Sequence, residues 1–145
     1  MSDAEKLSAR QQGLAEWKNE SVQSLIDWAQ AVRVDEQGML ENPLGAMGPV
    51  EELLRDEDIS TLGREDFNWL AAKLLVYVAA VLAQANGGSW AVDDDPSSPS
   101  YTRYVIRNDA GEKFDPGRVV MGYFGDPPGR SLVQHIAAAE AAATT

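Results

Sequence analysis

Apolar residues recur at intervals of three, four and seven through the first 33 residues of the chain, which is the spacing of one helix face. Ser2 or Asp3 can cap the start of such a helix, and Gly13 is a weak point inside it. The pattern therefore predicts a long amphipathic helix over residues 1–33. Its apolar face consists of Leu7, Leu14, Trp17, Ser21, Leu25, Trp28 and Val32.

The following segment, residues 34–48, mixes turn residues with apolar ones. Its glycines and the pair Asn42-Pro43 are typical of turns, while its apolar side chains predict that it packs against the rest of the fold. A short helix is expected to begin at Pro49, because proline is tolerated at the first helical position. Glu51 would then lie in the first turn, where the helix dipole favours anions.

The middle of the chain carries a stretch that is apolar on nearly every face. A helix of this kind is enclosed by other elements, so we predict a central buried helix over residues 64–86. Thr61 is the expected cap, and Gly87-Gly88 ends the helix. The stretch is a little short for a membrane span and contains Asn68 and Lys73, which favours burial within the protein.

Beyond the central helix the period of the apolar positions changes from 3.6 to 2, as in strands. Residues 89–92 and 101–107 predict two strands, and residues 112–114 can pair back as a third, so that 89–115 form a β-hairpin region. Two short helices are expected within residues 116–143. At this length the chain is most simply one domain.

The elements together predict a single α+β domain over residues 1–145. It consists of a central buried helix with a long N-terminal helix, a small two- to three-stranded antiparallel sheet and two short C-terminal helices.

Composition narrows the function classes. The chain has 145 residues, 23 of them acidic and 12 basic, for a formal net charge of −11, and it has no cysteine. An excess of anions argues against nucleic-acid binding, because each bound phosphate requires a cation. The missing cysteines exclude disulfides and fit a reducing cytoplasm, and the acidic start is unlike a secretory signal. We expect a soluble cytoplasmic protein with no nucleic-acid or membrane partner.

Asp93, Asp94 and Asp95 form the most conspicuous local cluster of charge. Three adjacent carboxylates on an extended chain point to alternating sides, so they cannot all bind one cation. The spacing also differs from that of a calcium loop. The sequence predicts a solvated loop here, and neither a metal site nor a cofactor; the alternative is a cation site that Asp109 or Asp115 completes in space.

No catalytic constellation stands out. His135 is the only histidine and lies on a predicted helix, where a structural role is expected. Gly87-Gly88-Ser89-Trp90-Ala91 has the wrong spacing for a nucleophile elbow. The later glycines match neither a dinucleotide fingerprint nor a phosphate-binding loop. We therefore expect that the protein is not an enzyme.

Aromatic and basic side chains supply the candidate contacts for a partner or ligand. Trp17 and Trp28 lie on one stripe of the first helix, where core packing and partner binding are alternatives. Arg103 and Arg107 are four apart on one predicted strand and would face the same side. The full set is Trp17, Trp28, Trp90, Tyr101, Arg103, Tyr104 and Arg107.

Residues 65–138 resemble a set of small, uncharacterised bacterial α+β domains. The shared pattern is an apolar helix with Tyr77 that ends in Gly87-Gly88-Ser89-Trp90, then a hairpin, then Phe114-Asp115-Pro116 and two short helices. Some members of the set resemble immunity proteins encoded near toxins. The resemblance implies a bacterial protein with a protein partner and no reaction, and it supplies no catalytic residues.

Three hypotheses follow from the sequence. The first is a non-catalytic, immunity-like domain whose acidic surface binds a protein partner, with a basic partner as the favoured case. The alternative is a small-molecule-binding protein or enzyme with a pocket between the sheet and the central helix. The third is a homodimer formed through Trp17 and Trp28.

Overall fold

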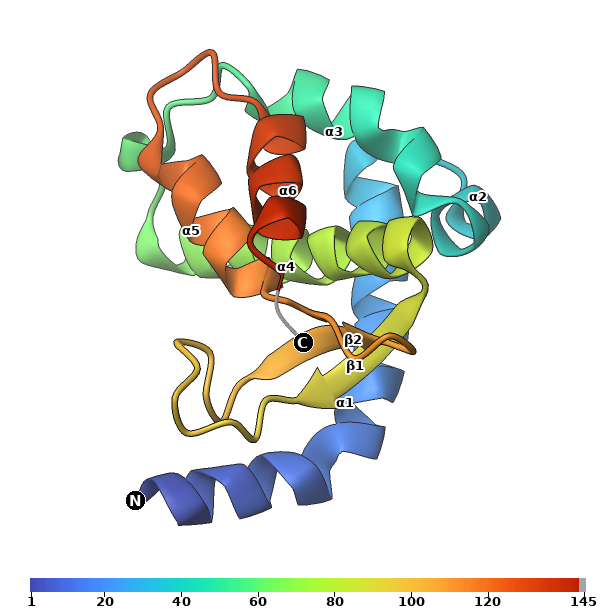
Figure 1. Cartoon of the computed structure of the whole chain (residues 1–145). Coiled ribbons are helices and arrows are strands. Elements are labelled where there is room, and N and C mark those ends of the chain that lie inside the picture. The colour runs from blue at the N-terminus through green and yellow to red at the C-terminus, as the bar shows by residue number, and fades with distance from the viewer. Residues whose placement is uncertain (144–145) are drawn as a thin grey trace.

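The computed structural model describes residues 1–143. Within them the chain forms six α-helices, two short 3₁₀ helices and one three-stranded antiparallel sheet, which confirms the predicted α+β class. Figure 1 shows α4 crossing the middle of the molecule, with α3, α5 and α6 on one side and the sheet on the other. The elements are α1 (Asp3–Val32), α2 (Glu36–Glu41), η1 (Pro43–Ala46), α3 (Met47–Leu54), η2 (Ile59–Thr61), α4 (Arg64–Asn86), β1 (Gly88–Val92), β2 (Tyr104–Asn108), β3 (Lys113–Phe114), α5 (Pro116–Gly125) and α6 (Leu132–Ala141).

The first helix has two unlike parts. Its N-terminus is capped by Ser2, whose side chain accepts a hydrogen bond from the Glu5 N–H, as predicted. In the second half Leu25 and Trp28 are buried, whereas in residues 3–13, here called the N-terminal arm, most side chains are exposed. Figure 1 shows α1 changing direction between these parts, so that the sheet separates the arm from α4.

The segment after α1 is more helical than its turn residues predicted. Asp35 accepts a hydrogen bond from the Gly38 N–H and so caps the short helix α2. Pro43 then opens η1, and α3 begins at Met47, two residues before the predicted start. Glu51 therefore lies beyond the first turn of α3, where it was predicted, and its side chain is buried.

The central helix α4 occupies the predicted residues 64–86. The expected cap is wrong, because Thr61 belongs to η2 and Gly63 precedes α4. Gly87 ends the helix in the left-handed conformation with φ of 67°, as its lack of a Cβ allows. Its buried residues lie in the second half, between Leu74 and Leu82, so the helix is enclosed over part of its length only.

By length and composition α4 could also cross a membrane, with a mean hydropathy of 1.5 over its most apolar 18 residues. In this fold the helix contacts α1, α5, α6 and the sheet. Those contacts bury 39% of that 18-residue window. The buried residues of α4 include Tyr77, whose hydroxyl donates to the Pro43 carbonyl at 2.8 Å.

The sheet has the order β1–β2–β3, and both pairs are antiparallel. Ile106 of β2 pairs with Trp90 of β1 along one edge and with Phe114 of β3 along the other edge. Paired residues point to the same face of a sheet, and here that face is the one toward the core. The strand β2 begins at Tyr104, three residues later than predicted, because Thr102 turns the chain with φ of 73°.

The C-terminal helices pack back on α3 through buried polar groups. Asp115 caps α5 and Ser131 caps α6. A carboxylate oxygen of Glu51 accepts the Leu132 N–H at 2.7 Å, and Arg130 donates to the Leu54 carbonyl at 2.6 Å. Glu51 and Arg130 are therefore buried with their hydrogen bonds made, as buried charges require.

Candidate functional site

Three of the seven predicted contact residues meet where α1 changes direction. Trp17 of α1 stacks on Tyr104 of β2, with ring centroids 4.8 Å apart and planes within 14°. Trp90 of β1 meets Trp17 edge-on at 5.3 Å. Both arrangements suit the quadrupoles of aromatic rings. The sequence thus identified the members of this aromatic cluster, although they lie far apart along the chain.

The same tyrosine positions the N-terminal arm. Its hydroxyl donates to the Arg10 carbonyl at 2.8 Å, and a Cβ at Gly13 would lie 3.1 Å from that hydroxyl oxygen. A side chain that engages a helix carbonyl is a recognised cause of helix bending. Gly13 therefore has a packing role, since it lets Tyr104 approach the helix backbone.

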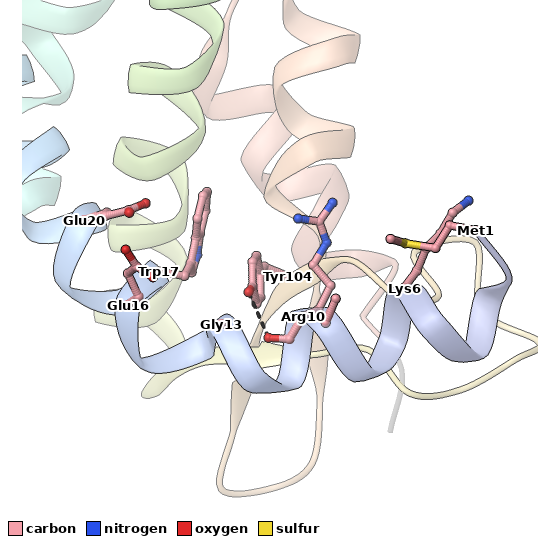
Figure 2. A pocket seen from close by; sticks show the side chains of 9 residues that line it. Met1, Lys6, Arg10, Gly13, Glu16, Trp17, Glu20 and Tyr104 are labelled. Atoms are coloured by element: carbon pink, nitrogen blue, oxygen red, sulfur yellow. Dashed lines mark hydrogen bonds between the residues drawn. The ribbon is translucent and has the colours of Figure 1, made fainter.

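A groove of about 480 Å³ runs along this bend. Figure 2 shows Tyr104 lying between Trp17 and Arg10, whose guanidinium carbon is 5.5 Å from the centre of the tyrosine ring. The faces of Tyr104 are thus occupied by side chains of the protein itself. This arrangement supports a joint between the arm and the sheet better than a platform for a ligand.

The remaining predicted contacts are not part of this cluster. Trp28 is fully buried in the core, which corrects its assignment as a partner contact and removes the predicted stripe of Trp17 and Trp28 as a dimer surface. Tyr101 lies partly buried in the turn before β2. The exposed surface needed for a contact at Trp28 is therefore absent, because α1 buries that part of its apolar face against α4 and its neighbours.

Both predicted arginines have acidic neighbours. Arg103 donates to the Asp115 carboxylate at 2.9 Å, and Arg107 lies 4.0 Å from a carboxylate oxygen of Asp94. Because β2 begins at Tyr104, Arg103 precedes the strand, so the prediction of both arginines on one strand is wrong. The pairs neutralise positive charge that an anionic ligand would need.

The aspartate run is only partly solvated. Asp94 and Asp95 are exposed as predicted, but Asp93 is fully buried, which corrects the prediction of a solvated triplet. Its carboxylate accepts the hydroxyls of Ser98 and Ser100 at 2.5 Å each, and Lys113 lies 3.1 Å away. The loop therefore folds around one carboxylate.

These donors also control the charge of Asp93. Burial raises the pKa of its carboxyl group, but the hydrogen bonds it accepts, led by those from Ser100 and Ser98, outweigh burial and lower the pKa to about 2. Asp93 is thus an ionised, fully satisfied carboxylate. Its oxygens are used inside the protein, which leaves them unsuited to bind a cation or to accept a proton from a substrate.

The described residues offer little for metal or acid–base chemistry. Between residues 1 and 143 no group of three or more histidine, aspartate or glutamate side chains is placed to share a metal ion. His135 accepts or donates one hydrogen bond with Asp126 at 2.6 Å, which ties α6 to the end of α5. Gly122 packs against the imidazole ring, so the histidine has a clear structural environment.

The acidic side chains are unevenly distributed. Residues 35–66, here called the acidic segment, contain ten of the 23 acidic and two of the 12 basic residues, which is a net charge of −8 out of −11. Nine of the ten are exposed, and none of those nine forms an ion pair with another described residue. Counting charge by segment would have found this feature in the sequence.

Apolar side chains are exposed within the acidic segment. Leu40 and Leu44 are each 41% exposed, and Leu53 is 46% exposed. They belong to α2, η1 and α3. Turns were predicted for α2 and η1, and α3 was predicted to begin at Pro49. Exposed apolar side chains that lie within a polar rim can contribute to a contact with another protein.

A second hollow lies between the sheet and the central helix, where a pocket was predicted. It encloses about 320 Å³ and is lined by residues of α1, α4, β1 and β2. Of the seven predicted contact residues, Trp90 lines this hollow. Tyr101, Arg103, Tyr104 and Arg107, which were expected near the pocket, do not line it.

Comparison of this chain with known protein families, with curated proteins and with solved structures finds no match.

Proposed function

We propose that the protein is a non-catalytic binding protein whose acidic segment engages a basic protein partner. The observation that carries this proposal is the concentration of eight net negative charges, exposed and unpaired, in residues 35–66. A role like that of an immunity protein in a bacterial cytoplasm fits within it. Such a protein needs a surface complementary to its partner and no reactive groups.

The exposed leucines add the second component of a protein interface. Long-range attraction between opposite charges raises the rate of association, while burial of apolar surface slows dissociation. In the acidic segment both occur in the same stretch of chain, because Leu40 precedes Glu41, Leu53 follows Glu52 and Leu44 lies between these glutamates. A partner with lysine or arginine around an apolar ridge would match it.

Charge reversal tests the proposal. We expect the double variant Glu52→Lys and Glu57→Lys to lose captured basic partners, because it replaces attraction by repulsion within the acidic segment. The measurement is affinity capture at low salt and near 1 M salt, where the screening length falls to roughly 3 Å. Wild-type protein should retain its partners at low salt only.

The matched control is Glu16→Lys with Glu20→Lys, which changes the net charge by the same amount on exposed residues of α1. It should capture the same proteins as the wild type. Equal recovery by all three proteins, or recovery that salt does not change, would contradict the proposal.

A further inference from the structure

The hollow between α1, α4 and the sheet has apolar walls and an open mouth. Val76 and Ala79 of α4, Leu25 of α1 and Ile106 of β2 are buried residues that reach its surface, and Trp90 closes one side. The hollow exists because α4 presents the small side chains Ala79, Ala80 and Ala83 here. Larger residues at these positions would fill it.

Three polar side chains line the hollow, those of Lys18, Ser21 and Ser89, and Lys18 is the one that carries a charge. Ser21 lines the wall, but its hydroxyl donates to the Trp17 carbonyl at 2.8 Å and is therefore occupied. Lys18 lies on α1 one turn from Val22 and also lines the hollow. Its side chain is exposed, and no carboxylate of residues 1–143 lies within ion-pair distance of it.

We propose that this hollow binds the apolar chain of a small amphipathic carboxylate, with the ammonium group of Lys18 holding the carboxylate at the mouth. A largely apolar cavity with one polar group at its edge fixes the orientation of such a ligand. A single lysine matches one negative charge, whereas a phosphate group or a nucleic acid would require several cations.

The size of the hollow restricts the ligand further. About 320 Å³ is at the low end of the range for small-molecule sites. It accommodates one short acyl or aryl chain, and it is too small for the two long chains of a membrane lipid. The site uses none of the residues of the acidic segment, so it is independent of the proposed protein partner.

Decanoate is a suitable probe, because it combines one short chain with one carboxylate. Its binding should change the fluorescence of the protein and shift the NMR signal of the Trp90 indole N–H, since that ring forms a wall of the hollow. Absence of saturable shifts at Trp90 in a decanoate titration would overturn the proposal and leave the hollow as a contact for a partner's apolar side chain.

Filling the hollow provides the first variant. Ala80→Leu places a larger side chain in the hollow on a partly exposed position of α4, and it should weaken decanoate binding at least tenfold. Ala85→Leu is the matched control, since Ala85 is exposed on the same helix and does not line the hollow. Equal affinities for both variants would overturn the location of the site.

The role of Lys18 needs a second comparison. Lys18→Gln should weaken decanoate binding about tenfold and leave the binding of decanol unchanged, because only the carboxylate uses the charge. Lys6→Gln, a change of the same kind elsewhere on α1, should affect neither ligand. If Lys18→Gln weakens both ligands equally or neither, the assignment of the carboxylate to Lys18 is wrong.

Discussion

The helical end of the molecule holds its largest fully buried side chains, whereas the loop at the hairpin end folds around one buried, ionised carboxylate. At the helical end, formed by the second half of α1 and by α3 to α6, the largest fully buried side chains include Trp28, Tyr77 and Tyr123. At the hairpin end, formed by the sheet, residues 93–103 and the N-terminal arm, the buried carboxylate of Asp93 organises the loop. The sheet residue Ile106 joins the two ends through the core.

The difference predicts different responses to conditions. Apolar burial depends little on pH and salt, whereas a buried ionised group stabilises the fold only while it keeps its charge. The helical end should therefore contribute most of the overall stability, and Asp93 at the hairpin end should contribute a part that depends on pH. Three sets of variants test this comparison.

The largest effect is expected at the helical end. Trp28→Ala should lower the free energy of unfolding by about 3–5 kcal/mol, because it leaves a cavity in a fully buried site. Denaturant unfolding followed by circular dichroism measures the loss. Trp69→Ala is the control, since that tryptophan is 47% exposed and should cost about 1 kcal/mol. Equal losses at both positions would show that the helical core is not where the structure places it.

A smaller, pH-dependent effect is expected at the hairpin end. The pKa of Asp93 in the folded state is about 2, below its ordinary value of 3.8. The ionised carboxylate therefore contributes about 2 kcal/mol above pH 4, and this contribution is lost as the pH falls from about 4 to 2. Asp93→Asn should remove that part of the stability and flatten the acid limb of the curve.

Asp94→Asn is the matched control for this pH profile. It changes the adjacent aspartate, which is exposed, and should leave the acid limb as in the wild type. Unfolding by urea at several pH values between 2 and 7 compares the three proteins. An acid limb that Asp93→Asn does not alter would show that the buried carboxylate is not the group that responds to pH.

The smallest effect concerns the N-terminal arm. Tyr104→Phe keeps the ring between Trp17 and Arg10 but removes the hydroxyl that donates to the Arg10 carbonyl. The free energy of unfolding should change by about 1 kcal/mol or less, while amide hydrogen exchange in residues 3–13 should become faster.

Tyr101→Phe serves as the control for the arm, because the Tyr101 hydroxyl makes no hydrogen bond to residues 1–143. Its exchange rates should match those of the wild type. If Tyr104→Phe left exchange in the arm unchanged, the hydroxyl would not be what fastens the arm to the sheet.

Much of the fold could be predicted because its signals are local. The change of apolar period after Gly88 predicted the sheet, and the uniform apolar stretch predicted α4 with its correct ends. The helix α2 was missed because its six residues are too few to show a period, and its cap at Asp35 was the one available signal. The prediction of such a short helix depends on recognising a single capping side chain, because the helix is too short to show an apolar period.

The site could be predicted in part only. The cluster of Trp17, Trp90 and Tyr104 consists of residue types that were singled out. The partners of buried Asp93 are Ser98, Ser100 and Lys113, and the last of these is twenty residues later in the chain. The hollow is a space left between three elements, and a sequence does not show how closely helices and strands approach. Trp28 was ambiguous because core and surface tryptophans have the same helical spacing.

The hydrogen bonds between α3 and the start of α6 have a consequence for how the chain folds. Residues 51–55 and 129–132 are joined by three of them, from Leu132 to Glu51, from Arg130 to Leu54 and from Gly129 to Arg55. The contacts enclose α4 and the whole sheet in one loop, and such closures are slow and occur late. During synthesis Glu51 emerges long before its donor, so we expect the nascent chain to complete its packing only when its last helices leave the ribosome.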